Sequence, residues 1–122
     1  MSQKTYLYVI GAPGGEACVA KVGITQSPMS RLNQIFTGCP RRRRLVPDGL
    51  ELFALFGFQS RQDAQDIERL ILLSNQEAKA DARTLGWLLV RPLYLLPQIR
   101  VLAALAEIDT KEFGYSYSRH AS

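Results

Sequence analysis

At 122 residues, the chain is long enough for one domain with a hydrophobic core and too short for two. Hydrophobic residues make up 47% of it, which argues against wholesale disorder. The 15 Lys and Arg against 11 Asp and Glu give a net charge of +4, a mild argument for an anionic partner.

Neither of the two cysteines, Cys18 and Cys39, lies in a CxxC motif or a Cys/His cluster, so the sequence offers no support for a zinc site or a disulfide framework. No basic-then-apolar leader opens the chain, and no apolar run approaches the length of a membrane span. We therefore expect a soluble protein of the reducing cytoplasm, with no membrane partner.

The first third of the chain predicts a hairpin followed by a short helix. Residues 6–10 are β-branched and aromatic, and a glycine-rich loop separates them from a second apolar run over 17–24. Ser27 is a good N-cap and Pro28 suits the first helical position, so a helix is expected to about Phe36. We expect Leu32, Ile35 and Phe36 on its buried side. Gly38 and Pro40 are its stop signals.

Four consecutive arginines follow these stop signals and hold 4 of the 15 basic residues: Arg41, Arg42, Arg43 and Arg44. We expect them to form a strongly positive loop that contacts a phosphodiester backbone. The alternative is a solvated loop that only aids solubility.

The rest of the chain predicts alternating strands and helices. The expected elements are a strand over 50–58, a helix over 61–82 capped by Ser60, a short strand over 87–90 and a last helix over 97–108. The order indicates an α+β fold, a small antiparallel sheet flanked by helices. We assign residues 1–108 to this domain and expect 109–122 to be a loose polar tail.

Three polar side chains occupy positions that packing alone would not select. Lys21 interrupts an apolar strand, and Arg31 lies at the border of the apolar face of the first helix. Glu68 falls within the apolar stripe of the long helix, where a carboxylate costs several kcal/mol of desolvation unless a cation compensates it. The alternatives are a buried Glu68–Arg31 ion pair, or a rotated helix that lets Glu68 reach solvent.

Tyr6 and Tyr8 are two residues apart and so share one face of the first strand. Phosphoryl transfer needs a group that activates or orients water, a cation that stabilises negative charge, and a carboxylate that holds a divalent metal. Tyr8, Lys21, Arg31 and Glu68 supply these groups.

The sequence resembles the GIY-YIG nuclease superfamily, in the phage- and prophage-associated branch whose second motif reads KVG or KIG. Tyr6-Leu7-Tyr8-Val9-Ile10 is similar to the GIY strand, and Lys21-Val22-Gly23 to the YIG strand. Arg31 follows Lys21 by the expected ten positions. Leu32, Thr37-Gly38-x-Pro40, Glu68 and Trp87 also match, so the resemblance covers residues 6–90.

The resemblance implies a GIY-YIG-like fold and an endonuclease that hydrolyses DNA with Mg²⁺ or Mn²⁺. Glu68 would ligate the metal, Tyr8 with Lys21 would activate or orient water, and Arg31 would stabilise the developing charge. The arginine run would track the backbone, and a partner protein or a homodimer could supply specificity. His120, the only histidine, is expected to be a dispensable surface residue.

Two other functions remain open at this stage. One is a nucleic-acid-binding module on the same scaffold, with weak or no catalysis. The other is a protein-interaction domain that uses residues 87–96 and the last helix as its contact surface.

Overall fold

The computed structural model describes residues 4–38, 40–79, 86–114 and 117–120, with the backbone alone at residues 40, 41 and 43. The fold is α+β, as predicted. A six-stranded sheet with antiparallel pairings has the order β4-β2-β1-β3-β5, and β6 also pairs with β3. The strands are β1 (Thr5–Gly11), β2 (Ala20–Thr25), β3 (Gly49–Phe58), β4 (Trp87–Leu88), β5 (Thr110–Phe113) and β6 (Ser118–His120).

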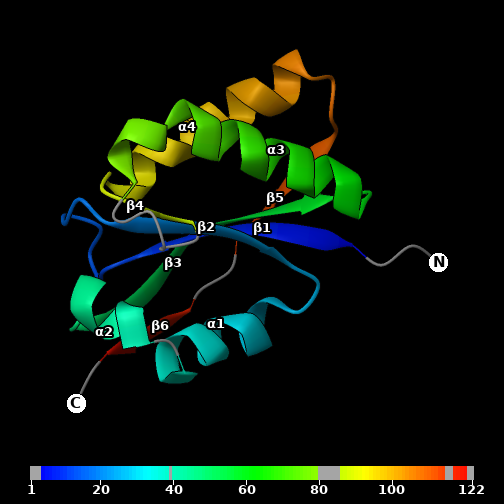
Figure 1. Cartoon of the computed structure of the whole chain (residues 1–122). Coiled ribbons are helices and arrows are strands. Elements are labelled where there is room, and N and C mark those ends of the chain that lie inside the picture. Colours follow the sequence, from blue (N-terminus) through cyan, green and yellow to red (C-terminus); the bar gives the residue numbers. More distant parts are fainter. Residues whose placement is uncertain (1–3, 39, 80–85, 115–116, 121–122) are drawn as a thin grey trace.

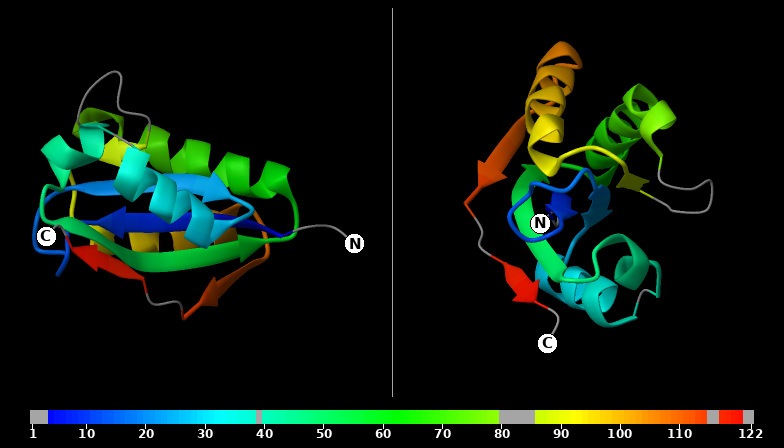
Figure 2. Two further views of the ribbon diagram at one scale, coloured as in Figure 1. Left: turned by 90° about the horizontal axis from the view of Figure 1, so that it is seen from below. Right: turned by 90° about the vertical axis from the view of Figure 1, so that its left-hand side faces the viewer.

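Helices cover both faces of the sheet (Figures 1 and 2). They are α1 (Pro28–Gly38), α2 (Pro40–Leu45), α3 (Arg61–Ser74) and α4 (Pro92–Leu105), with a 3₁₀ turn, η1 (Gln76–Ala78). Helices α3 and α4 lie on one face and α1 and α2 on the other, and each layer closes its own core. No helix in the described part of the chain is long and apolar enough to cross a membrane.

Strand alternation divides β1 between the two cores. Leu7 and Val9 face α3 and α4, whereas Tyr8 and Ile10 face α1 and α2. The predicted hairpin is confirmed, because β1 pairs with β2 in a register that sets Tyr8 opposite Gly23 and Ile10 opposite Lys21. Strand β2 begins at Ala20, three residues later than expected.

The arginine run is not a loop, which corrects the sequence-based expectation. Pro40 begins α2, where its fixed φ and missing N–H suit a first helical residue, and arginine is a good helix former. Cys39, between α1 and α2, lies outside the described residues.

Three helix boundaries also differ from prediction, and one of them is the end of α4, at Leu105 rather than near 108. Helix α3 ends at Ser74 rather than near 82, because the Asn75 side chain donates hydrogen bonds to the Ile71 carbonyl (2.8 Å) and to Gln98 (2.9 Å). Residues 80–82 of the predicted helix lie outside the described part. Helix α4 begins at Pro92 rather than Pro97. Pro97 is tolerated inside it because Leu93, four residues earlier, is exposed, so water can reach the carbonyl left without a partner.

The expected loose tail over 109–122 is wrong for the residues that the structure describes there. Strand β5 pairs with the last residues of β3, and β6 pairs with its first residues. The ten residues of β3 would otherwise present an unpaired outer edge, and the tail pairs with seven of them and accepts a hydrogen bond from the Leu52 N–H at the Tyr117 carbonyl. Between the two short strands, Tyr117 is buried in the core under α1.

Candidate functional site

Tyr8 is held against the β2 backbone at Gly23. Its ring lies on the face that α1 covers, and only 1% of the residue is exposed. A Cβ at position 23 would stand 2.2 Å from the Tyr8 hydroxyl oxygen and 2.4 Å from Cζ. The glycine of the Lys21-Val22-Gly23 motif therefore provides the space that the tyrosine occupies.

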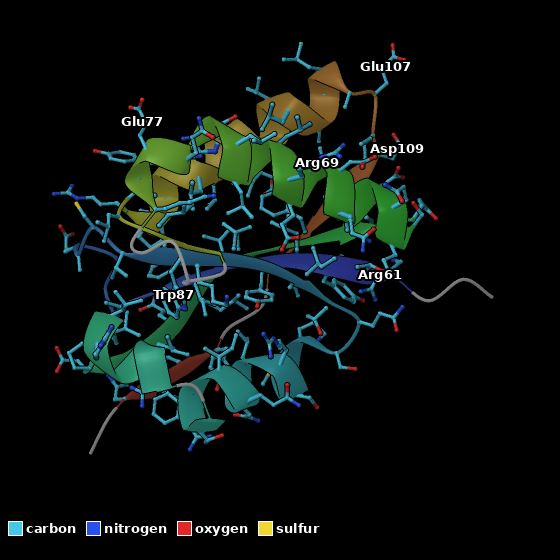
Figure 3. The ribbon with its side chains drawn as sticks, viewed as in Figure 1. Arg61, Arg69, Glu77, Trp87, Glu107 and Asp109 are labelled. Atoms are coloured by element: carbon cyan, nitrogen blue, oxygen red, sulfur yellow. The ribbon has the colours of Figure 1, made fainter. Side chains whose placement is uncertain are left out.

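Lys21 lies on the same face as Tyr8. It pairs across the sheet with Ile10 on one side and with Trp87 on the other, and both belong to the core under α1. The ammonium is 5.6 Å from the Trp87 ring centroid, a cation–π contact, and the residue is 8% exposed. Figure 3 shows Trp87 on the side of the sheet that faces α1 and α2.

The Lys21 ammonium lies close to Gly86, the residue that precedes β4. A Cβ on Gly86 would stand 3.2 Å from Lys21 Nζ and 2.3 Å from the Val22 carbonyl oxygen. Its φ of +80° also favours glycine. The sequence indicated that Gly86 breaks the helical pattern before Trp87, but it gave no sign of this contact with Lys21.

Glu68 comes from the opposite helical layer, on α3, where it is half-buried beside Ala64 and Ile71. Burial raises the pKa of its carboxyl, and the positive charges of Lys21 and Arg61 partly oppose this shift. The effect of Lys21 means that two groups on opposite faces of the sheet interact electrostatically. Strand β4 pairs with Ala20 and Lys21 of β2, and the Lys21 ammonium lies near Gly86, the residue before this short strand.

Arg31 lies apart from these contacts. Its side chain is exposed on α1 and donates a 3.5 Å hydrogen bond to Gln34 one turn later. In the described part of the chain, no ion pair joins Arg31 to Glu68, so the alternative of a buried bridge between them is not observed. The structure thus brings Tyr8 and Lys21 together on one face and couples Lys21 to Glu68, while Arg31 stands at the surface.

The arginine run is divided between packing and exposure. Arg42 is 6% exposed, stacks over Phe36 at 4.6 Å and donates to the Val46 carbonyl at 3.2 Å. Its Nε is buried and has no hydrogen-bond partner among the described residues. Arg44 is exposed, whereas the side chains of Arg41 and Arg43 lie outside the description. Arg42 therefore anchors α2 and is not available to a nucleic acid.

Asn33 and Phe36 of α1 connect the helix that carries Arg31 to the C-terminal strand, a role that the sequence did not indicate. The Asn33 side chain accepts hydrogen bonds from the Tyr117 hydroxyl (2.9 Å) and from Arg119 (3.1 Å). Phe36 contacts the guanidinium of Arg119 at 4.8 Å in addition to that of Arg42. His120 is exposed in β6, and its Nε2 lies 3.1 Å from the Ser118 hydroxyl oxygen.

Glu68 is the residue of the predicted site that could hold a metal ion. Its carboxylate bears a desolvation penalty that a divalent cation would offset. The described residues contain no group of three or more Asp, Glu, His or Cys side chains able to hold a metal. Magnesium is commonly held by one or two carboxylates together with substrate phosphates and water, so a single carboxylate suits a metal that binds with its substrate.

Comparison with protein-family models matches residues 5–90 to the T5orf172 domain, a phage-associated domain with nuclease-like context. The match extends from the start of β1 to two residues past β4 and includes all four residues of the predicted site. No curated protein and no solved structure matches the chain.

Proposed function

The chain belongs to the T5orf172 domain family, and on that premise we propose that it is a divalent-metal-dependent endonuclease domain of GIY-YIG type that hydrolyses phosphodiester bonds in DNA. The observation that carries the proposal is a half-buried carboxylate, Glu68, on an otherwise apolar helix face, in a chain whose sheet also buries the ammonium of Lys21. Burial raises the pKa of the Glu68 carboxyl, and ionisable groups with perturbed pKa values are typical of functional sites.

Each residue has a distinct role in this proposal. Glu68 would hold Mg²⁺ or Mn²⁺, which supplies Lewis-acid stabilisation of the phosphate when it is bound. Lys21 shares a sheet face with Tyr8 and its charge acts on Glu68, so its ammonium would lower the energy of an anionic oxygen formed there. Arg31, exposed on α1, would approach the phosphate from solvent and stabilise the charge that develops on it.

A cleavage assay with supercoiled plasmid and with branched DNA tests the proposal. We expect nicking with Mg²⁺ or Mn²⁺, loss of at least 100-fold in rate for Glu68→Ala, and little change in DNA affinity. Glu77→Ala is a matched control, because Glu77 is an exposed carboxylate in η1 outside the predicted site (Figure 3). Equal nicking by the wild type and by Glu68→Ala would refute the assignment.

One observation favours a second function, a nucleic-acid-binding module with weak or no catalysis. Tyr8 and Lys21 are only 1% and 8% exposed, so little of either side chain is accessible to a water molecule or a phosphate. In that case salt-sensitive DNA binding occurs without cleavage in any divalent metal. The same plasmid assay, run beside a binding titration, separates the two functions.

A further inference from the structure

A cluster of lysine and aromatic side chains lies on the α1 face of the sheet, away from Lys21 and Glu68. It consists of Lys4, Tyr6, Lys111 and Phe113, and we call it the lysine platform. The ammonium groups of Lys4 and Lys111 lie 5.3 Å and 5.4 Å from the centroid of the same ring, Phe113. Tyr6 contacts that ring edge-on at 5.6 Å.

The sheet register explains why these four side chains meet. Tyr6 is opposite Gly57, and Gly57 is opposite Lys111, so the three lie in one row across β1, β3 and β5. Phe113 belongs to the next row, opposite Leu55, and leans over Gly57, where a Cβ would stand 2.6 Å from its ring. Gly57 therefore lets one ring lie within reach of both lysines.

The platform is open to solvent. Lys4 and Lys111 are exposed, and Figure 2 (left) shows β5 clear of α1 and α2. A shallow pocket of about 130 Å³ lies beside the two lysines. It is lined by Lys4, Gly57, Phe58, Gln59, Asp109, Thr110 and Lys111.

The charge balance of β5 favours an anion on this face. Glu112 alternates to the opposite face, where Arg100 donates to both of its carboxylate oxygens and lowers its pKa. Its charge is therefore compensated away from the platform. Asp109 is the acidic residue that lines the pocket, and it is exposed.

We propose that the lysine platform is a second nucleic-acid subsite, which holds backbone phosphates of the strand bound at the Tyr8 site. Tyr6 and Tyr8 share one face of β1, and β5 lies two strands from β1, or about 10 Å at the usual strand spacing. A short stretch of nucleic acid covers that distance. Two ammonium groups over one aromatic ring neutralise phosphates without reading bases, so the subsite is independent of sequence.

This inference rests on the proposed function, and a binding titration of the full chain tests it separately from cleavage. The variant is Lys4→Gln/Lys111→Gln, probed by fluorescence anisotropy with labelled single-stranded and duplex DNA over a salt series. We expect the affinity to fall at least severalfold at low salt. The slope of log K against log salt should decrease by about 1.4 for the single strand and about 1.8 for the duplex, because two phosphate contacts are lost.

The matched control is Arg69→Gln/Arg91→Gln, which removes the same charge from exposed positions. Arg69 lies on α3, across the sheet, and Arg91 precedes Pro92, which packs against Gly11 at the opposite end of β1 from Lys4. Asp109→Asn is the variant of opposite sign, and we expect it to strengthen binding. An unchanged salt slope in the lysine variant, or one equal to that of the control, would overturn the inference.

The remaining outcomes also decide between explanations. If labelled polyglutamate binds the wild type as tightly as DNA and loses affinity equally in the lysine variant, the platform binds acidic polymers in general and the nucleic-acid inference fails. If the wild type never cuts DNA but the lysine variant loses affinity and slope, the subsite stands and the nuclease proposal falls. If cleavage depends on Glu68 while the lysine variant binds as the control does, the reverse holds.

Discussion

Replacing Gly23 with alanine tests the contact that holds the Tyr8 hydroxyl in place. The added Cβ would stand 2.2 Å from the hydroxyl oxygen, 2.4 Å from Cζ and 2.9 Å from Cε2 of Tyr8. Tyr8 is 1% exposed and cannot move into solvent, so either the ring or the strand must shift. Overpacking of this kind costs about 1–3 kcal/mol, although alanine is otherwise favoured over glycine within a strand by roughly 0.5–1 kcal/mol.

Chemical denaturation monitored by circular dichroism measures this loss, and a double-mutant cycle identifies its origin. Gly38→Ala is the matched control, because a Cβ there meets nothing within 4 Å, and we expect no loss of stability from it. In a Tyr8→Leu background the ring atoms are gone, so Gly23→Ala should cost at least about 1 kcal/mol less than in the wild type. An equal cost in both backgrounds would refute the steric explanation and place the effect in the strand backbone.

Three further predictions concern the carboxylate, the arginine run and the C-terminal contact. Because burial raises the pKa of Glu68, its ionised form opposes folding, so the free energy of unfolding should decrease as the pH rises from 4.5 through the folded pKa. Glu68→Gln should therefore raise the Tm at neutral pH by a few degrees. An unchanged or lower Tm would contradict the desolvation argument. Arg42→Ala should lower the free energy of unfolding by roughly 1–3 kcal/mol, whereas Arg44→Ala should leave it unchanged, as measured by urea unfolding. Equal effects would show that Arg42 does not anchor α2. Asn33→Ala should cost about 1–2 kcal/mol and increase hydrogen exchange in β6, whereas retained protection would show that the strand holds without α1.

The Arg42 result also bears on how the arginine run is tested. If the run contacts a nucleic-acid backbone, neutralising Arg41, Arg42, Arg43 and Arg44 together should reduce the salt dependence of DNA binding. Arg42 is buried, so that variant would also weaken α2 and confuse binding with stability. Arg44→Gln, at an exposed position, is the cleaner measure of the contribution of the run.

Local patterns predicted the elements of the first half well because their signals are short-range. The apolar run of β1, the glycine-rich turn and the Ser27-Pro28 start of α1 each act within a few residues, and the hairpin and the helix are where these signals place them. The helix boundaries that were missed depend on long-range contacts. Helix α3 ends where Asn75 reaches Gln98 of α4, a partner 23 residues away.

The candidate site shows the same division. Periodicity indicated that Glu68 belongs to the buried side of its helix, and the structure finds it half-buried with a raised pKa. The roles of Tyr8, Lys21, Arg31 and Glu68 in catalysis stay predictions. The four residues do not share one sheet face, which no local pattern could show, because Glu68 lies on α3 in the other helical layer and Arg31 is exposed on α1.

The sequence by itself determined the α+β class, the hairpin that places Tyr8 over Gly23, and an unusual carboxylate on an apolar helix face, because strand alternation and helical periodicity are local rules. The secondary structure of the last residues depends on tertiary pairing and could be seen only in the structure. Nothing local in residues 109–122 predicts strands, and β5 and β6 form because β3 presents a ten-residue edge whose backbone groups need partners. The same pairing places Lys111 and Phe113 beside Lys4 and Tyr6. The platform combines residues from both ends of the chain, so it forms only when β1 and β5 pair with the two edges of β3.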